Sequence, residues 1–337
     1  MTLATKSVQN NHQSPLEVLS NLLADDMKAV NACIMDKMHS DVALIPQLAS
    51  YLISAGGKRL RPLLTIASAK MCGYKGDRAH NLAACVEFIH TATLLHDDVV
   101  DDSNIRRGNQ SANAVFGNEA AVLVGDFLFS RAFQLMVEDG SLPVLRILSG
   151  ASAIIAEGEV MQLSSAHNMD TGFDTYLQVI TSKTAALFAA ACETGAVIAD
   201  QDEQRCQALH DYGLNLGIAF QIADDVLDYT ASQDKLGKSL GDDLRDGKIT
   251  LPIIYALENA TDDERAFWYS IFVNKKIDDE TLPRAIKICE AHNSFKKSLE
   301  TANLYKEKAI SSLSLFDDNE IKSIFVDLCD YVIARSS

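Results

Sequence analysis

Two aspartate clusters with the pattern Asp-Asp-x-x-Asp lie in different halves of the chain, each inside apolar residues with helical spacing. Positions i and i+4 of a helix share a face, so the carboxylates of each cluster point the same way. Burying like charges this closely is very costly without counter-cations. The fold must therefore present both acidic faces to bound cations. The clusters are Asp97, Asp98 and Asp101, and Asp224, Asp225 and Asp228.

Magnesium suits such clusters because it prefers oxygen ligands and takes one or two carboxylates together with phosphate oxygens. The paired clusters predict a diphosphate held between two helices by magnesium. A single cluster in an acidic chain could instead be a solvated helix face. Two copies in apolar surroundings favour metal binding.

The chain is predicted to be helical almost throughout. It has only six prolines, and its apolar residues show no sustained alternation of period two. Ser14, Pro15 and Glu17 form a capping-box pattern that begins the first helix, and Gly56-Gly57 ends the next. Further helices are expected over residues 78–102, 118–139, 142–165, 173–199, 203–230 and 250–273, followed by C-terminal ones.

Several of these helices, such as 82–95 and 185–199, are apolar nearly all round, so neighbours must cover them on all sides. This favours an all-α bundle of about ten or more helices, with outer helices around central ones. No Ser/Gly/Pro-rich linker interrupts the chain, so residues 15–337 are expected to form a single domain. The polar segment 1–14 lacks a secretory-signal layout and is expected to be a flexible tail.

The net charge of −16 argues against a nucleic-acid partner, because phosphate backbones select basic surfaces. It does not exclude a small diphosphate, since magnesium and a few basic side chains reverse the charge locally. Seven cysteines without CxxC spacing indicate reduced core thiols in a cytoplasmic protein. The longest apolar stretch, 184–199, is interrupted by Glu193 and is too short to span a bilayer.

Basic residues surround the acidic clusters in the sequence. Lys58 and Arg61 follow Gly56-Gly57 at a helix junction, where they could donate to phosphate or serve the helix dipole. His90 lies about two turns before Asp97 on a similar face, although a lone histidine is often only a core residue. Arg106-Arg107 could neutralise the first cluster or hold two separate anions.

Three lysines further along the chain are also candidates. Lys183, followed by Thr184, enters an apolar helix, where it could bind an anion or simply extend its amine to water. Lys238 and Lys248 each follow a glycine in a polar segment beyond the second cluster. That segment can fold back over the cluster.

These motifs together resemble those of the trans-isoprenyl diphosphate synthases, the polyprenyl synthetase family. The resemblance covers nearly the whole chain and is strongest to bacterial long-chain members, above all those with octaprenyl products. It implies the isoprenoid synthase fold with a central apolar cavity. The motifs are GGKRLRP, LLHDDVVD with RRG following, KT, FQIADDVLD and GDDLRDGKITLP.

The resemblance also assigns roles. Both acidic clusters bind Mg²⁺, about two to three ions in all, and together with Lys183 they are the catalytic residues. Positions that match the isopentenyl diphosphate site are Lys58, Arg61, His90 and Arg107. Positions that match the allylic diphosphate site are Arg106, Lys183, Thr184, Gln221, Lys238 and Lys248.

The reaction implied is ionisation of the allylic diphosphate, attack by the double bond of isopentenyl diphosphate, and loss of a proton. Farnesyl diphosphate is the expected primer, and the product is expected to serve as a quinone side chain. A homodimer with at most transient membrane contact is also implied. A terpene cyclase would leave Lys58 and Arg61 unused, and a non-catalytic subunit would have lost ligands from a cluster.

The residues before Asp97 are expected to set product length. Each isoprene unit adds about one helical turn, roughly 5 Å, and the residues one turn back, Ala92 and Thr93, are small. Small residues here predict long products, about C40 in length, although they could merely permit close helix packing. Shorter products, or others between C35 and C50, remain alternatives. The deeper floor is expected among Phe88, Ile89, Phe129 and Phe133.

Overall fold

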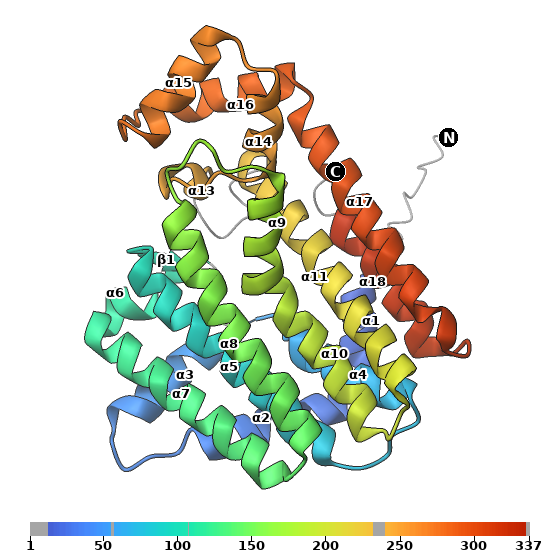
Figure 1. Ribbon diagram of the computed structural model, residues 1–337. Helices are drawn as coiled ribbons and strands as arrows, with labels where there is room; N and C mark the ends of the chain where they lie inside the picture. Colours follow the sequence, from blue (N-terminus) through green and yellow to red (C-terminus); the bar gives the residue numbers. More distant parts are fainter. Residues whose placement is uncertain (1–12, 55–56, 107, 232–239, 335–337) are drawn as a thin grey trace, which may run out of the picture.

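The protein is described here by a computed structural model covering residues 13–54, 57–106, 108–231 and 240–334 (Figure 1). The described chain is almost entirely helical, as predicted, and its two strands form one short hairpin. Most of the predicted tail, residues 1–12, lies outside the described residues. At Ser14 the capping box is present, since the Ser14 amide donates to Glu17 Oε2 at 2.7 Å and the Glu17 amide donates to Ser14 Oγ at 3.3 Å.

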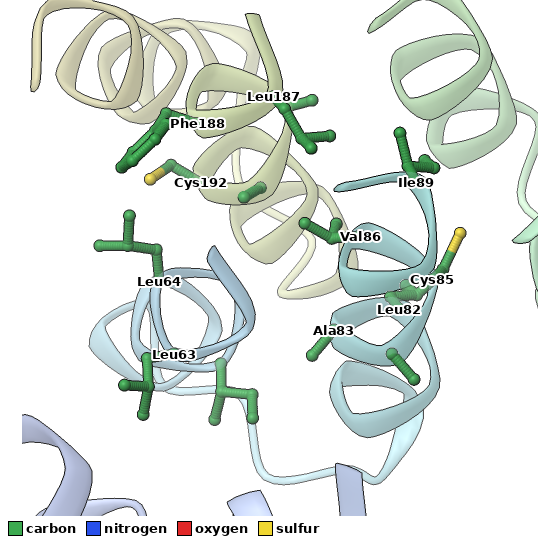
Figure 2. Packing of buried hydrophobic residues seen from close by; sticks show 14 of the residues in the cluster. Leu63, Leu64, Leu82, Ala83, Cys85, Val86, Ile89, Leu187, Phe188 and Cys192 are labelled. Atoms are coloured by element: carbon green, nitrogen blue, oxygen red, sulfur yellow. The ribbon is translucent and has the colours of Figure 1, made fainter. Parts of the chain in front are cut away.

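The N-terminal half supplies the helices of the main core. In order, the elements are α1 (Pro15–Leu22), α2 (Ala24–Lys37), α3 (Leu44–Ser54), α4 (Leu60–Met71), α5 (Arg78–Val100), β1 (Ile105–Arg106), β2 (Asn109–Gln110), α6 (Ala112–Phe116), α7 (Asn118–Asp139) and α8 (Leu142–Ser165). Helix α5 is covered along most of its length, as its apolar sequence predicts. Figure 2 shows Leu64 of α4 and Phe188 of α10 pointing toward each other, while Val86 of α5 points toward α10.

The remaining elements are α9 (Phe173–Ile180), the π-helical turn η1 (Thr181–Ala185), α10 (Ala186–Ile198), α11 (Glu203–Thr230), α13 (Asp242–Arg245), α14 (Leu251–Glu258), α15 (Asp262–Phe272), α16 (Thr281–Ala291), α17 (Ser294–Ser312), η2 (Leu313–Leu315) and α18 (Glu320–Ala334). A second hydrophobic cluster packs around α14 to α17, and α11 contributes side chains to both clusters. Helices α15 and α16 lie at one end of the molecule (Figure 1).

The prediction of one helix over 250–273 was wrong. Two helices, α14 and α15, occupy this range, because Thr261 and Glu264 form a second capping box that begins α15. The Glu264 amide donates to Thr261 Oγ1 at 3.3 Å, and the Thr261 amide donates to Glu264 Oε2 at 2.8 Å. The Thr-x-x-Glu spacing was present in the sequence as a start signal.

Among the described helices, α7 is the one long and apolar enough to cross a membrane, and 44% of its most apolar window is buried in the protein. A core helix of a water-exposed bundle has the same composition, so this is weak evidence for a span. The seven cysteines are unpaired, and Cys85, Cys192, Cys289 and Cys329 are buried.

Candidate active site

A cavity of about 850 Å³ lies where α5, α8, η1 and α11 approach one another. Most of the site residues predicted from the sequence line it, although they come from six different segments. They are Lys58, Arg61, His90, Thr93, Asp97, Asp101, Arg106, Lys183, Thr184, Gln221, Asp224, Asp225, Asp228 and Lys248. Arg107 and Lys238 lie outside the described residues.

In the first acidic cluster, Asp97 and Asp101 face this cavity and each lies beside a lysine. Lys183 Nζ is 3.3 Å from Asp97 Oδ2, and Lys248 Nζ is 3.0 Å from Asp101 Oδ2. The two carboxylates are one helical turn apart, as the i, i+4 spacing requires. Each cavity-facing carboxylate of the cluster therefore has one positive side chain beside it.

Asp98 has a different environment. Its side chain is buried and lines a smaller cavity of about 50 Å³ on the other side of α5. Arg106 forms a two-pronged ion pair with it, through Nε at 2.7 Å and Nη2 at 2.6 Å from Asp98 Oδ1. Arg106 reaches both cavities. In this structure Arg106 is thus the counter-charge of Asp98, and its contact with a diphosphate stays a prediction.

In the second cluster, two neutral side chains donate to Asp225. The Tyr176 hydroxyl donates to Asp225 Oδ2 at 2.6 Å, and Gln221 Nε2 donates to Asp225 Oδ1 at 2.8 Å. Burial raises the pKa of Asp225 well above its ordinary value, and the negative charge of Asp243 adds to the increase. Asp228 accepts the Asp243 amide at 3.2 Å.

The π-helical turn η1 presents Lys183 and Thr184 to the cavity. Lys183 Nζ lies 2.6 Å from Glu159 Oε2, so Glu159 and Asp97 share one lysine. Burial and the charge of Asp97 raise the pKa of Glu159 to about 7. The Thr184 hydroxyl donates to Gln221 Oε1 at 2.8 Å, which links η1 to α11.

Glu159 and Tyr176 were missed by the sequence reasoning. Glu159 was detectable in principle, because it is a carboxylate within the apolar helix 142–165. Tyr176 carried no signal, since a tyrosine one turn into an amphipathic helix is usually a core residue. Only the packing of α9 against α11 brings its hydroxyl to Asp225.

Lys248 connects the first acidic cluster with the aspartates in and after α13. Besides Asp101 it contacts Asp246 at 2.9 Å and Asp243 at 4.0 Å. Burial alone would lower the pKa of Lys248, but the charges of Asp243, Asp101 and Asp246 outweigh it and raise that pKa. The segment reaches the second cluster at Asp243, whose amide donates to Asp228, whereas Lys248 itself contacts Asp101 of the first cluster.

The basic residues near α4 line the same cavity. Arg61 Nη1 lies 3.2 Å from His90 Nε2, and its guanidinium lies 4.5 Å from the centre of the Phe188 ring. Lys58 Nζ lies 6.0 Å from the centre of the Tyr331 ring. Two cations and a histidine thus converge from α4 and α5, in addition to those beside the acidic clusters.

The residues predicted to form a tunnel do not all line a cavity. Thr93 lines the large cavity and Phe88 the smaller one, whereas Ala92 and Ile89 are fully buried in the core and line neither. Phe129 stacks on His96 with ring centres 6.0 Å apart, and Phe133 is 44% exposed. The apolar part of the large cavity comes instead from Val179, Ile180, Phe188 and Phe220.

The donor set fits magnesium. Within the described part of the chain, no three His, Cys, Asp or Glu side chains are placed to surround one metal ion. Each ion would therefore take one or two carboxylates, from Asp97, Asp101 or Asp224, and complete its shell with phosphate oxygens and water. Lys183 and Lys248 are shared with further carboxylates, those of Glu159, Asp243 and Asp246, so these two lysines alone do not balance the acidic charge.

Comparison with known proteins agrees with this geometry. The family model for polyprenyl synthetase matches residues 42–289. Octaprenyl diphosphate synthase of Escherichia coli (strain K12) is 43% identical over 320 residues, which cover 95% of this chain and 99% of that protein.

Solved structures agree as well. A decaprenyl diphosphate synthase from Rhodobacter capsulatus has a TM-score of 0.92 and 48% identity, covering 96% of this chain and 100% of that one. A polyprenyl synthase from Caulobacter crescentus CB15, complexed with calcium and isoprenyl diphosphate, has a TM-score of 0.93 and 46% identity, covering 97% and 100%. The predicted isoprenoid synthase fold is thereby confirmed, and the chain belongs to the polyprenyl synthetase family and is a prenyltransferase.

Proposed function

We propose that this prenyltransferase adds isopentenyl diphosphate units to an allylic primer, farnesyl diphosphate, in a Mg²⁺-dependent reaction that gives octaprenyl diphosphate for quinone side chains. The observation that carries the proposal is the single cavity lined by two acidic clusters and by two groups of cations. Lys183 and Lys248 lie at the carboxylates, whereas Lys58 and Arg61 enter from α4. Two groups of cations suit two diphosphates.

The allylic diphosphate would bind at Lys183, Lys248 and the cavity-facing carboxylates. Magnesium, when bound, supplies positive charge to the leaving diphosphate. Lys183 and Lys248 donate hydrogen bonds to the oxygens of the leaving diphosphate and stabilise the negative charge that develops on those oxygens. The apolar walls at Val179, Ile180 and Phe220 exclude water from the allylic cation.

The second substrate would bind its diphosphate at Lys58, Arg61 and His90. Arg61 presents a planar fork that suits phosphate oxygens, and Phe188 and His90 hold that fork in place. The reaction requires no protein nucleophile, and on the family pattern the proton lost after condensation would pass to the released diphosphate. The proposal also includes Arg107 and Lys238 as diphosphate ligands on the family pattern.

We base the product length on Thr93, which lines the large cavity, and no longer on Ala92, which is buried in the core. Relatives of similar identity are named for octaprenyl and decaprenyl products, so the family alone does not fix the length. We expect Thr93→Tyr to shorten the products to about C15 to C20, because the ring would block growth one turn from Asp97. Chromatography of the dephosphorylated products tests this, and an unchanged C40 product would remove Thr93 from the tunnel wall.

The proposal extends to a cytoplasmic homodimer with at most transient membrane contact. Helices α7 and α8 carry large apolar side chains that are two-thirds exposed in the single chain, including Leu123, Val137 and Leu163. A second copy covering this surface would bury them and explain the apolar character of α7. Light scattering should show a dimer for the native chain and dissociation for Leu123→Asp with Val137→Asp; a native monomer would contradict the proposal.

The main test uses the purified chain with farnesyl diphosphate, radiolabelled isopentenyl diphosphate and Mg²⁺, with and without a chelator. Metal-dependent incorporation into a long product is expected. A terpene cyclase would consume the allylic substrate without incorporating label. A non-catalytic subunit would do neither until a partner was added.

A further inference from the structure

One buried ion pair beside the cavity has no part in the chemistry described so far. Arg59 Nη1 donates to Glu87 Oε1, and the Glu87 side chain is only 9% exposed. Both residues line the large cavity and also the smaller one, so the pair forms part of the wall between them. The structure therefore places a paired charge in the wall of the substrate cavity.

The backbone of Arg59 makes this pair unusual. Arg59 has φ 48° and ψ 33°, a left-handed conformation that costs free energy for a residue with a side chain. It is the N-cap of α4 and forms no side-chain capping hydrogen bond there. The conformation must be maintained by contacts elsewhere, and the ion pair with Glu87 is such a contact.

The turn at Arg59 determines where its neighbours point. Lys58 precedes it and Arg61 follows at the first turn of α4, and both line the cavity. A change of backbone conformation at Arg59 would redirect Lys58 relative to Arg61. The spacing of these two cations therefore depends on the contact that holds Arg59.

Helix α5 holds the beginning of α4 at two points. Glu87 contacts Arg59, and His90, one turn later, lies 3.2 Å from Arg61. Three cations within four positions repel one another, and Glu87 neutralises the middle one. The outer two then retain their charge for an anion in the cavity.

We propose that Glu87 is a positioning residue for the isopentenyl diphosphate site: by pairing with Arg59 it fixes the turn that aims Lys58 and Arg61. The inference rests on the proposed function, which assigns the second diphosphate to Lys58 and Arg61. Arg59 itself is held by Glu87 and is not a substrate ligand.

The test is steady-state kinetics of Glu87→Gln, which keeps the shape of the side chain and removes its charge. We expect the KM for isopentenyl diphosphate to rise about tenfold, with kcat and the KM for farnesyl diphosphate changed by less than about twofold. Arg59→Gln should have the same effect. The double variant should be no worse than either single one, because the two residues act as a unit.

A matched control breaks another ion pair of the same helix. Arg78, at the start of α5, donates to both carboxylate oxygens of Asp139, at 2.9 and 3.0 Å. Asp139→Asn should lower the melting temperature and leave both KM values unchanged. This control separates loss of stability from loss of positioning. If Glu87→Gln does not fold, Arg59→Gln measured alone carries the same expectation, because it removes the same ion pair from the other side.

Three outcomes would overturn the inference: an unchanged KM for isopentenyl diphosphate, an equal rise in both KM values, or a lower KM because a released Arg59 binds the diphosphate itself. Lys58→Gln and Arg61→Gln test the proposed function separately. If they leave the KM for isopentenyl diphosphate unchanged, the site assignment fails. If they raise it and Glu87→Gln does not, only the positioning role fails.

Discussion

The two acidic clusters share one sequence pattern but differ in their partners. The described carboxylate contacts of the first cluster are with cations: Lys183, Arg106 and Lys248 contact Asp97, Asp98 and Asp101 respectively. In the second cluster, Asp225 accepts from Tyr176 and Gln221, and Asp228 from a backbone amide. The two middle aspartates, Asp98 and Asp225, carry the comparison: the motif fixes the spacing of the carboxylates, whereas the surrounding elements decide whether the buried one meets a cation or neutral donors.

The largest effect should come from a cavity-facing aspartate of either cluster. We expect Asp97→Asn and Asp224→Asn each to lower kcat about 10²- to 10³-fold, because each removes charge that would hold metal and diphosphate. Rates with saturating farnesyl diphosphate at several Mg²⁺ concentrations check this. Full activity in either variant would show that the clusters are not equivalent as metal sites.

The middle aspartates, Asp98 and Asp225, should contribute differently to the free energy of unfolding. Asp98→Asn leaves Arg106 partly buried without its counter-charge, so we expect a loss of about 2 kcal/mol in the free energy of unfolding. Asp225→Asn keeps an oxygen for the Tyr176 hydroxyl and removes a buried charge, so it should be neutral or stabilising. Urea unfolding in the presence of a chelator measures both, and equal losses would contradict the comparison.

The stability difference at Asp225 should depend on pH. Its pKa is raised in the folded state, so the folded protein binds this proton more tightly than the unfolded chain. The native protein therefore loses this contribution to stability as pH rises above the ordinary aspartate value of about 4. Asp225→Asn cannot ionise, so its stability relative to the native chain should increase from about pH 4 to neutrality. A difference in the free energy of unfolding between the two proteins that stays constant across that pH range would contradict this.

The smallest effect is expected for Glu159→Gln. Lys183 would lose its contact with the Glu159 carboxylate but keep Asp97, so kcat should change by less than about threefold. Steady-state rates measure this directly. A loss above about tenfold would mean that Glu159 takes a direct part in binding the metal or substrate.

Much of the fold was predictable because the signals that begin and extend a helix lie within a few residues of one another in the sequence. The capping box at Ser14 and the apolar lengths of α5 and α10 required no knowledge of distant contacts. The missed boundary at Thr261 was also local and could have been found. The spacing of Asp97 and Asp101 likewise predicted a shared face, which the structure contains.

What could not be predicted was tertiary pairing. The turn of Asp98 toward Arg106 depends on the hairpin β1–β2, and the contact of Tyr176 with Asp225 depends on how α9 packs on α11. The same holds for the apolar cavity wall, which is built by residues of α9, α10 and α11. Sequence spacing specifies neighbours within one helix, whereas these contacts join helices far apart in the chain.

The π-helical turn η1 limits which insertions and deletions the chain can accept. A π turn holds one residue more than a regular helical turn, so it separates the registers of α9 and α10. Deleting a single residue from Thr181–Ala185 would let the two helices join, rotating one against the other by about 100°. Tyr176 and Phe188 could then no longer both face their present neighbours. Length changes in this segment should therefore be tolerated far less than substitutions at positions other than Lys183 and Thr184.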